Sequence, residues 1–219
     1  MTPAQIVTQI KNVIQKMIEV GLSNQQNYPV LTDTGPRANE IGIAGAPRLS
    51  VSMKKVPYRT IYEALDRSGA YHIRMIDGAL LQMCYRFDKG TVIAHRLCMF
   101  PAPHLPNYDA DPESYDKDEL YADIVEEGIV HIPIRFDFDA ANDRHIDVNH
   151  PKSHLTLGQY PNCRIPVSAP ISPARFMKFI LRNFYYTAFH AANLEGIDGA
   201  FKFQETLTAN ERAITYLAG

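Results

Sequence analysis

Apolar and polar side chains alternate along much of the segment from His131 to Val167, and this alternation constrains the fold more than any other feature. Successive side chains of a strand point to opposite faces of a sheet, so a period of two indicates strands with one apolar and one polar face. If residues 150–153 form the loop of a hairpin, Asn149 and His154 lie opposite each other and their polar sets converge. The pattern predicts strands at about 129–138, 144–148, 154–158 and 163–167.

The same alternation occurs between Tyr71 and Phe100, where two turn sequences separate three strand-like runs. Asp77-Gly78 and Asp88-Lys89-Gly90 are typical of hairpin turns, because glycine readily adopts the positive φ that tight turns need. We therefore expect strands at 71–76, 80–87 and 92–100. Together the two regions predict an α+β fold, in which an antiparallel sheet of about six to eight strands, arranged in hairpins, has helices covering one face.

Apolar side chains recur at helical spacing on both sides of the strand-forming region. The expected helices cover residues 3–20, 58–67, 173–190 and 208–217. Residues 23–56, rich in Asn, Gly and Pro, are expected to form a long connection with one or two short strands. A chain of 219 residues suffices for one substantial core, so we expect a single domain over 1–219. Its sheet would extend over 71–167 and be interrupted by an acidic loop at 107–127.

Charge is unevenly distributed along the chain, although the net charge is only −2. Residues 107–127 contain nine acidic residues and a single lysine, so the rest of the chain is net positive. The three cysteines form no CxxC pair, which argues against a disulfide framework and against a four-thiolate zinc site. The amphipathic N-terminus lacks the features of a signal peptide, and no apolar run reaches membrane-spanning length. We therefore expect a cytoplasmic protein that does not associate with a membrane.

Four side chains suited to acid–base or metal chemistry lie close together in the sequence: His145, Asp147, His150 and His154. Histidine transfers protons near neutral pH, so these four are the candidate catalytic residues if the protein is an enzyme. Imidazole and carboxylate groups also suit zinc or manganese, but their spacing here matches no metal-binding motif. We therefore expect neither a metal ion nor another cofactor.

Two motifs are compatible with a hydrolase. The sequence His154-Leu155-Thr156-Leu157 has the form found in the two-histidine phosphoesterases, but those enzymes need two such motifs, and no other histidine has Ser or Thr two places later. Arg135, Asp137 and Asp139 resemble the clusters that hold magnesium in nucleases, although the Glu and Lys usual in such enzymes are not found on the next strand. A histidine-dependent or metal-dependent hydrolase therefore stays open as an alternative.

Basic side chains are expected on the polar sheet face and on one side of the helix at 173–190. Arginine and lysine contact phosphate groups, and 12 tyrosines and 10 phenylalanines are available to stack on unpaired bases. We therefore predict that this combined surface binds nucleic acid or a phosphorylated ligand. A protein-interaction or structural subunit without a ligand is the second alternative. The candidate phosphate contacts are Arg74, Arg86, Arg135, Arg164, Arg175, Lys178 and Arg182.

Four stretches occur in a distinctive order: YHIRMIDGALLQMCYRF at 71–87, HPKSHLTLG at 150–158, CRIPV at 163–167 and SPARFMKFILRNFY at 172–185. In this order they resemble an uncharacterised family of bacterial proteins, over most of residues 57–187. The resemblance implies a small bacterial accessory protein, encoded beside defence or mobile-element genes and working with a protein partner in a larger complex. It supplies no catalytic assignment.

Overall fold

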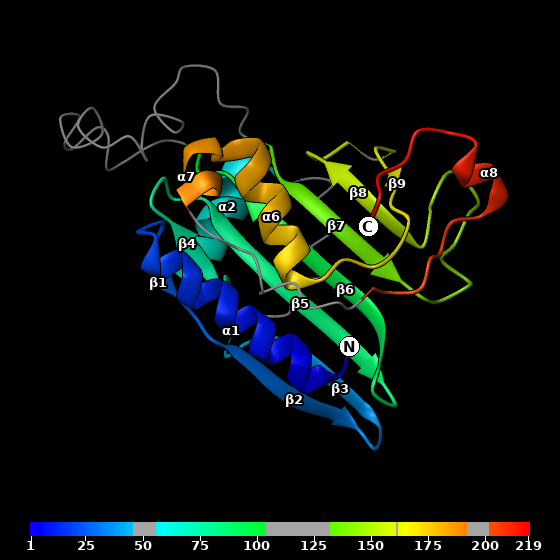
Figure 1. The fold of residues 1–219 in the computed structure, drawn as a ribbon, viewed down its shortest axis with the longest axis horizontal. Coiled ribbons are helices and arrows are strands. Elements are labelled where there is room, and N and C mark those ends of the chain that lie inside the picture. The colour runs from blue at the N-terminus through cyan, green and yellow to red at the C-terminus, as the bar shows by residue number, and fades with distance from the viewer. Residues whose placement is uncertain (46–55, 104–131, 161, 192–201) are drawn as a thin grey trace.

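The computed structural model describes residues 1–45, 56–103, 132–160, 162–191 and 202–219. Within them, nine strands form one sheet in the order β1-β4-β5-β6-β7-β8-β9, while β3 pairs with the far end of β5 and β2 pairs with β3 (Figure 1). The strands are β1 (Ser23–Gln26), β2 (Pro29–Gly35), β3 (Ala38–Ile43), β4 (Ile73–Met75), β5 (Leu80–Asp88), β6 (Thr91–Phe100), β7 (Ile134–Asp139), β8 (Ser153–Leu157) and β9 (Ile165–Pro166). The helices are α1 (Pro3–Glu19), α2 (Tyr58–Arg67), α6 (Pro173–Phe184), α7 (Tyr186–Ala191) and α8 (Ala209–Arg212). The α+β fold with an antiparallel sheet is thus confirmed.

Several elements differ in extent from the predicted ones. Residues 23–56 contribute three strands within the described residues, rather than one or two. The helix expected at 173–190 is divided into α6 and α7 at Tyr185, whose backbone leaves the helical region and whose hydroxyl group donates a hydrogen bond to Asp77 at 2.6 Å. At the C-terminus, α8 is a single turn. The acidic loop predicted at 107–127 lies outside the described residues.

The strand predicted at 144–148 is wrong. Ile146 and His150 form a single bridge across a tight turn, in which Val148 has a φ of 65°, a value that β-branched residues rarely adopt. The turn is held from outside, because both carboxylate oxygens of Asp147 accept hydrogen bonds from side chains at the start of α8. A regular strand here would break these hydrogen bonds.

The hairpin predicted around residues 150–153 is therefore also wrong. β8 pairs with β7 on one side and with β9 on the other. His154 consequently lies opposite Asp137 of β7, not opposite Asn149. The alternation within β7 and the hairpin of β5 and β6 agree with the sequence pattern.

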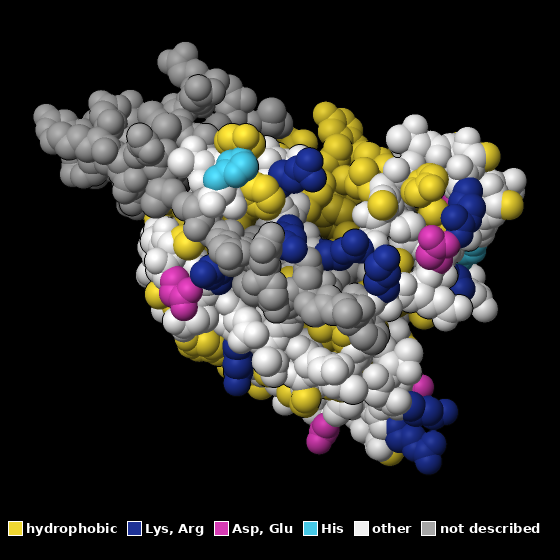
Figure 2. Space-filling view, viewed as in Figure 1, with side chains coloured by type: hydrophobic (Ala, Val, Ile, Leu, Met, Phe, Trp, Pro, Cys, Tyr) yellow, Lys and Arg dark blue, Asp and Glu magenta, His cyan; other side chains and the backbone are white. Residues whose placement is uncertain are grey.

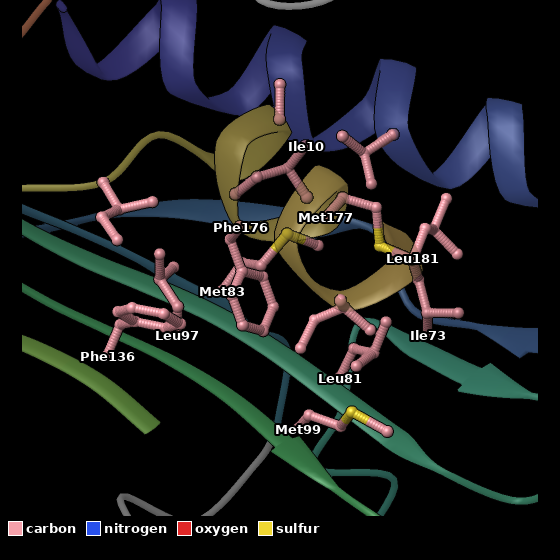
Figure 3. Close-up of a cluster of buried hydrophobic side chains, with 14 of the residues drawn as sticks. Ile10, Ile73, Leu81, Met83, Leu97, Met99, Phe136, Phe176, Met177 and Leu181 are labelled. Atoms are coloured by element: carbon pink, nitrogen blue, oxygen red, sulfur yellow. The ribbon is translucent and has the colours of Figure 1, made fainter. Parts of the chain in front are cut away.

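α1 and α6 cover the apolar face of the sheet. Thr2 and Gln5 form a capping box at the start of α1, and each helix has proline in its first turn. None of the described helices is both long enough and apolar enough to span a membrane. Figure 3 shows Ile10, Phe176, Met177 and Leu181 of the two helices against Leu81, Met83, Leu97, Met99 and Phe136 of the strands.

Ser172 caps α6, because its Oγ accepts a hydrogen bond from the main-chain nitrogen of Arg175 at 3.2 Å. Replacing Ser172 with alanine leaves that N–H group without its partner and is expected to lower the free energy of unfolding by about 1 kcal/mol. Urea denaturation followed by circular dichroism measures this change. An unchanged midpoint would contradict a capping role.

The second face of the sheet is divided between α2 and a polar region. Side chains on β5 and β6 that alternate with the core residues point to this face. Beyond the contact with α2, the same face carries the charged side chains of β3, β5, β6 and β7 and the imidazole of His154 on β8, and this region is the floor of the candidate site. The small apolar cluster under α2 consists of Ile61, Tyr62, Leu65, Leu80, Cys98 and Phe100, with Ala70, Tyr71 and Ala102 beside them.

Candidate functional site

A groove with a volume of about 970 Å³ lies over the polar region of the sheet, on the face opposite to α1 and α6. Its floor comes from β3, β5, β6, β7 and β8, and the segment 144–152 adds a wall. Basic side chains outnumber acidic ones among the described lining residues, which makes the groove suitable for anions. The basic ones are Arg86, Arg96, Arg135, Arg144, Lys152 and Arg164, and the acidic ones are Glu40, Asp137 and Asp139.

Asp137 stands at the centre of the groove floor, where the register places Arg96 of β6 and His154 of β8 on either side of it. Its Oδ1 accepts a hydrogen bond from Arg96 Nε at 3.1 Å, and its Oδ2 accepts one from Arg135 Nε. Burial opposes ionisation, but the two guanidinium groups outweigh it and hold the pKa of Asp137 below its ordinary value. Asp137 is therefore a carboxylate at neutral pH, with its charge matched by two arginines.

Asp139 repeats this arrangement nearer the end of β7. Its Oδ2 lies 3.0 Å from Arg144 Nη1 and 3.9 Å from Arg86 Nη2. These two arginines are more than half exposed, so the ion pairs hold the side chains in place more than they stabilise the fold. Each of these two groove carboxylates thus lies within ion-pair distance of two arginines, and the groove keeps its excess of positive charge.

His154 and His150 lie side by side in the groove wall, with ring centroids 5.1 Å apart. His154 Nδ1 lies 2.8 Å from the carbonyl oxygen of Pro151, which can only accept a hydrogen bond, so Nδ1 carries the proton. The neutral ring therefore has its lone pair on Nε2, which is 3.9 Å from Asp137 Oδ2. His150 is bonded in a similar way to the main chain of Arg144.

Burial is the main cause that lowers the pKa of both histidines below the ordinary value for imidazole. Nearby Asp137 opposes the shift in both rings, whereas the positive charge of Arg164 adds to it. Both rings are therefore mainly neutral at pH 7, and each has one nitrogen able to accept a proton. A bound anion would favour their protonated forms.

His145 and Asp147 belong to a separate cluster around α8. His145 Nε2 lies 3.0 Å from Oε1 of Glu211, a side chain that is fully buried. Asp147 accepts hydrogen bonds from Thr208 Oγ1 at 2.5 Å and Asn210 Nδ2 at 2.6 Å. Of the four candidate catalytic residues, His145, His150 and His154 thus line the groove and Asp147 does not, and His145 is also bonded to Glu211 outside the pair of His150 and His154.

The cluster of His145, Asp147 and Glu211 brings one ligand atom from each residue within 4.8 Å of the others, a spacing at which they could share a cation. Both carboxylates already accept hydrogen bonds at the start of α8: Asp147 from Thr208 and Asn210, and Glu211 from the main-chain nitrogen of Thr208 in a capping box. These contacts account for the burial of Glu211 without a ligand. No sequence pattern pointed to Glu211, because it is 66 residues from His145.

The predicted phosphate contacts do not form one surface. Arg86, Arg135 and Arg164 line the groove, whereas Arg74 is paired with Asp66 of α2 at 3.6 Å. The basic residues of α6 lie on the other side of the sheet, because the helix packs its apolar side onto the apolar face. Figure 2 shows lysine and arginine side chains on that face. The prediction that the sheet and the helix share one basic surface is therefore wrong. The α6 residues that lie away from the groove are Arg175, Lys178 and Arg182.

Three groove cations were missing from the predicted set: Arg96, Arg144 and Lys152. Arg96 had a usable signal, because it occupies a polar position in the alternating pattern of β6. Arg144 and Lys152 flank the turn for which a strand at 144–148 and a hairpin loop at 150–153 were predicted. The sheet face to which their side chains point could therefore not be predicted correctly. Lys152 Nζ donates a hydrogen bond to Asn142 Oδ1 at 2.7 Å.

One of three comparisons with known proteins gives a match. A family model described as an uncharacterised conserved protein, DUF2290, matches residues 22–218. Comparison with curated proteins and comparison with solved structures give no match. The family match extends beyond the residues 57–187 on which the resemblance to an uncharacterised family rests, and it includes every strand of the sheet. The chain therefore belongs to DUF2290, a family of uncharacterised conserved proteins.

Proposed function

We propose that the groove binds the phosphate groups of a nucleic-acid strand. The observation that carries this proposal is the gathering of six basic side chains against three acidic ones in a single groove. Phosphate contacts of this kind supply most of the affinity in binding that is independent of base sequence. The volume of about 970 Å³ is at the upper end for ligand pockets, which suits a ligand with several phosphates.

The ion pairs of the groove hold its arginine side chains in positions suited to phosphate binding. Arg96 and Arg135 each direct one Nε–H to Asp137, which leaves the terminal N–H groups of both guanidinium ions for a phosphate. Because these side chains are already fixed, less conformational entropy is lost on binding. Arg164 and Lys152 extend the positive charge along the wall beside the histidines.

Base recognition has less support than phosphate recognition. The aromatic lining residues Tyr85 and Phe138 are buried and belong to the apolar core. Among the described residues of the groove, the phosphate contacts therefore dominate, and we expect weak preference for base sequence. The sequence resemblance, and nothing else, supports the further proposal of a bacterial accessory protein that acts with a protein partner in a defence or mobile-element system. Its cytoplasmic location stays an expectation from the cysteine pattern and hydropathy of the sequence.

A charge-reversal experiment distinguishes binding of nucleic acid in the groove from binding at α6. The variant with Lys152→Glu and Arg164→Glu is expected to weaken binding of a fluorescent DNA oligonucleotide roughly 100-fold, because each lost charged hydrogen bond is worth about one order of magnitude. The slope of the logarithm of affinity against the logarithm of salt concentration should also decrease in magnitude by about two, since two ionic contacts are lost. Fluorescence anisotropy at several salt concentrations measures both quantities.

The matched control is Arg175→Glu with Arg182→Glu, which changes the net charge equally on exposed positions of α6. It is expected to keep the affinity of the unaltered protein within a factor of about three, since long-range charge effects are screened by salt. Loss of binding in the control but not in the groove variant would assign the ligand to α6. Binding that is absent or independent of salt would reject the proposed function.

A further inference from the structure

We propose that the groove cleaves RNA, by transfer of a backbone phosphate to the neighbouring 2′-hydroxyl group, with His154 and His150 moving the protons. This inference rests on the proposed function, because the strand must first lie in the groove. It adds an activity, a substrate class and two catalytic residues to that function.

The two histidines have the geometry that paired proton transfer needs. Their ring centroids are 5.1 Å apart, and both rings line the groove. Each ring is bonded to a main-chain group, His154 to Pro151 and His150 to Arg144, which fixes its orientation and leaves the second ring nitrogen for a ligand. One neutral and one protonated imidazole can then serve as base and acid on a phosphate bound beside both rings.

The other charged groups of the groove favour an internal nucleophile. Asp137 accepts hydrogen bonds from Arg96 and Arg135, while Asp139 accepts them from Arg144 and from the main-chain nitrogen of Ala141, so both carboxylates already have partners other than a divalent cation. What remains is proton transfer by histidine and stabilisation of negative charge by arginine. A 2′-hydroxyl group is held beside its own phosphate, and such proximity replaces much of the activation that an attacking water would need.

The reaction balances without any further reactant. His154 Nε2 removes the proton of the 2′-hydroxyl group, the bond from O2′ to phosphorus forms, and the bond from phosphorus to O5′ breaks. Protonated His150 gives its proton to the leaving O5′. The products are a 2′,3′-cyclic phosphate and a 5′-hydroxyl end, and the proton has moved from one histidine to the other.

Neighbouring groups support each role. Asp137, 3.9 Å from His154 Nε2, stabilises the positive ring that forms when His154 accepts the proton. The guanidinium groups of Arg96 and Arg135 face the same carboxylate and offer their remaining donors to the phosphoryl oxygens, on which charge increases in the transition state.

The test uses the full chain and two fluorescent oligonucleotides, one entirely of DNA and one with a single ribonucleotide in the same sequence. The second should be cut on the 3′ side of the ribonucleotide, in the presence of EDTA, with a cyclic phosphate identified by mass spectrometry. The first should bind with similar affinity and stay intact. His154→Ala and His150→Ala are each expected to reduce the cleavage rate about 10²–10⁴-fold.

His190→Ala, at an exposed position of α7, is the matched control and should cleave at the original rate. Because His154 is buried, circular dichroism and binding of the DNA strand show whether its variant is folded, and the half-buried His150 provides an independent variant. Binding of both strands without cleavage would overturn this inference and leave the proposed function intact. Cutting of the DNA strand, loss of cutting in EDTA, or equal rates in the His150 and His190 variants would overturn it as well.

Discussion

Lowering the pH from 7 to 5 is expected to reduce the free energy of unfolding by about 4 kcal/mol through His72 and His95. Both rings are fully enclosed in the fold, and burial lowers the pKa of each to about 4. Each ring also accepts a main-chain hydrogen bond, His72 Nδ1 from Met83 and His95 Nε2 from Ile171, both at 3.0 Å. Protonation would remove this hydrogen bond and leave a buried charge.

The direction of the effect follows from the two pKa values of each ring. The unfolded chain binds protons at these histidines below about pH 6.5, whereas the folded chain resists protonation down to about pH 4. The stabilisation is therefore complete above pH 6.5 and is lost as the pH falls, by about 1.4 kcal/mol per pH unit for each ring. Burial raises the pKa of Asp77, which acts in the opposite direction, so the comparison is made between variants.

Substitutions that keep a hydrogen-bond acceptor but cannot be protonated measure the contribution of each histidine to the pH dependence of stability. His72→Asn places an oxygen near the position of Nδ1, and His95→Gln places one near Nε2. Each variant is expected to lose about 2 kcal/mol less than the unaltered protein between pH 7 and pH 5 in urea denaturation. The exposed His190 provides the control His190→Gln, which should keep the full pH dependence. Parallel pH curves for all four proteins would refute the assignment.

Asp137→Ala is expected to lower the free energy of unfolding by about 2–3 kcal/mol, because it leaves the partly buried Arg135 without its counter-ion. Only 15% of the Asp137 side chain and 27% of the Arg135 side chain are exposed. The expected loss is smaller than for a fully enclosed pair, since Arg96, the second partner, is 44% exposed and can be hydrated. Urea denaturation at pH 7 measures the change.

The neighbouring ion pair supplies the matched control. Asp139→Ala removes the partner of Arg144, whose side chain is 65% exposed, and is expected to change stability by less than about 1 kcal/mol. Adding Arg135→Met to the Asp137→Ala variant removes the unpaired charge and should restore part of the loss. If both aspartate variants unfold at the same urea concentration, Asp137 is not the buried centre of the network.

The ion pair also has its own pH window. Since the pKa of Asp137 is held below its ordinary value, its contribution is present above about pH 4 and is lost only as the pH falls further. The destabilisation expected between pH 7 and pH 5 therefore comes from histidine and not from this carboxylate.

The sequence was sufficient to predict β7 and the hairpin of β5 and β6, but not the three strands within residues 23–43 or the partner of β8. Ile134, Phe136 and Phe138 are buried on alternate positions of β7 as predicted, and Lys89 and Gly90 adopt the positive φ of the expected hairpin turn. Periodicity reports the faces of a strand and carries no information about its partner. The assumption that β8 pairs with the segment just before it was therefore wrong, and with it the strand at 144–148.

The composition of the site could be predicted in part for the same reason. Arg86 and Arg135 reach the groove because parity places them on the polar face of β5 and β7, whereas Arg164 lines the groove from the position just before β9. For α6, the decisive information is its apolar side: Phe176 and Ile180 are buried and attach the helix to the apolar face, so its charged side points away from the sheet. Glu211 and the interior histidines depend on long-range packing that no local pattern describes.

Arg96, Asp137 and His154 form a single row across three strands, so their arrangement depends on how these strands are aligned. A slip of one residue between β7 and β8 would bring Leu155 opposite Asp137 and rotate the imidazole of His154 into the hydrocarbon interior. A synthetic peptide of residues 150–158 would therefore contain the most distinctive part of the sequence, but not the arrangement of side chains that requires β6 and β7. The row of Arg96, Asp137 and His154 is a property of strand alignment, and it forms only when β6, β7 and β8 have paired.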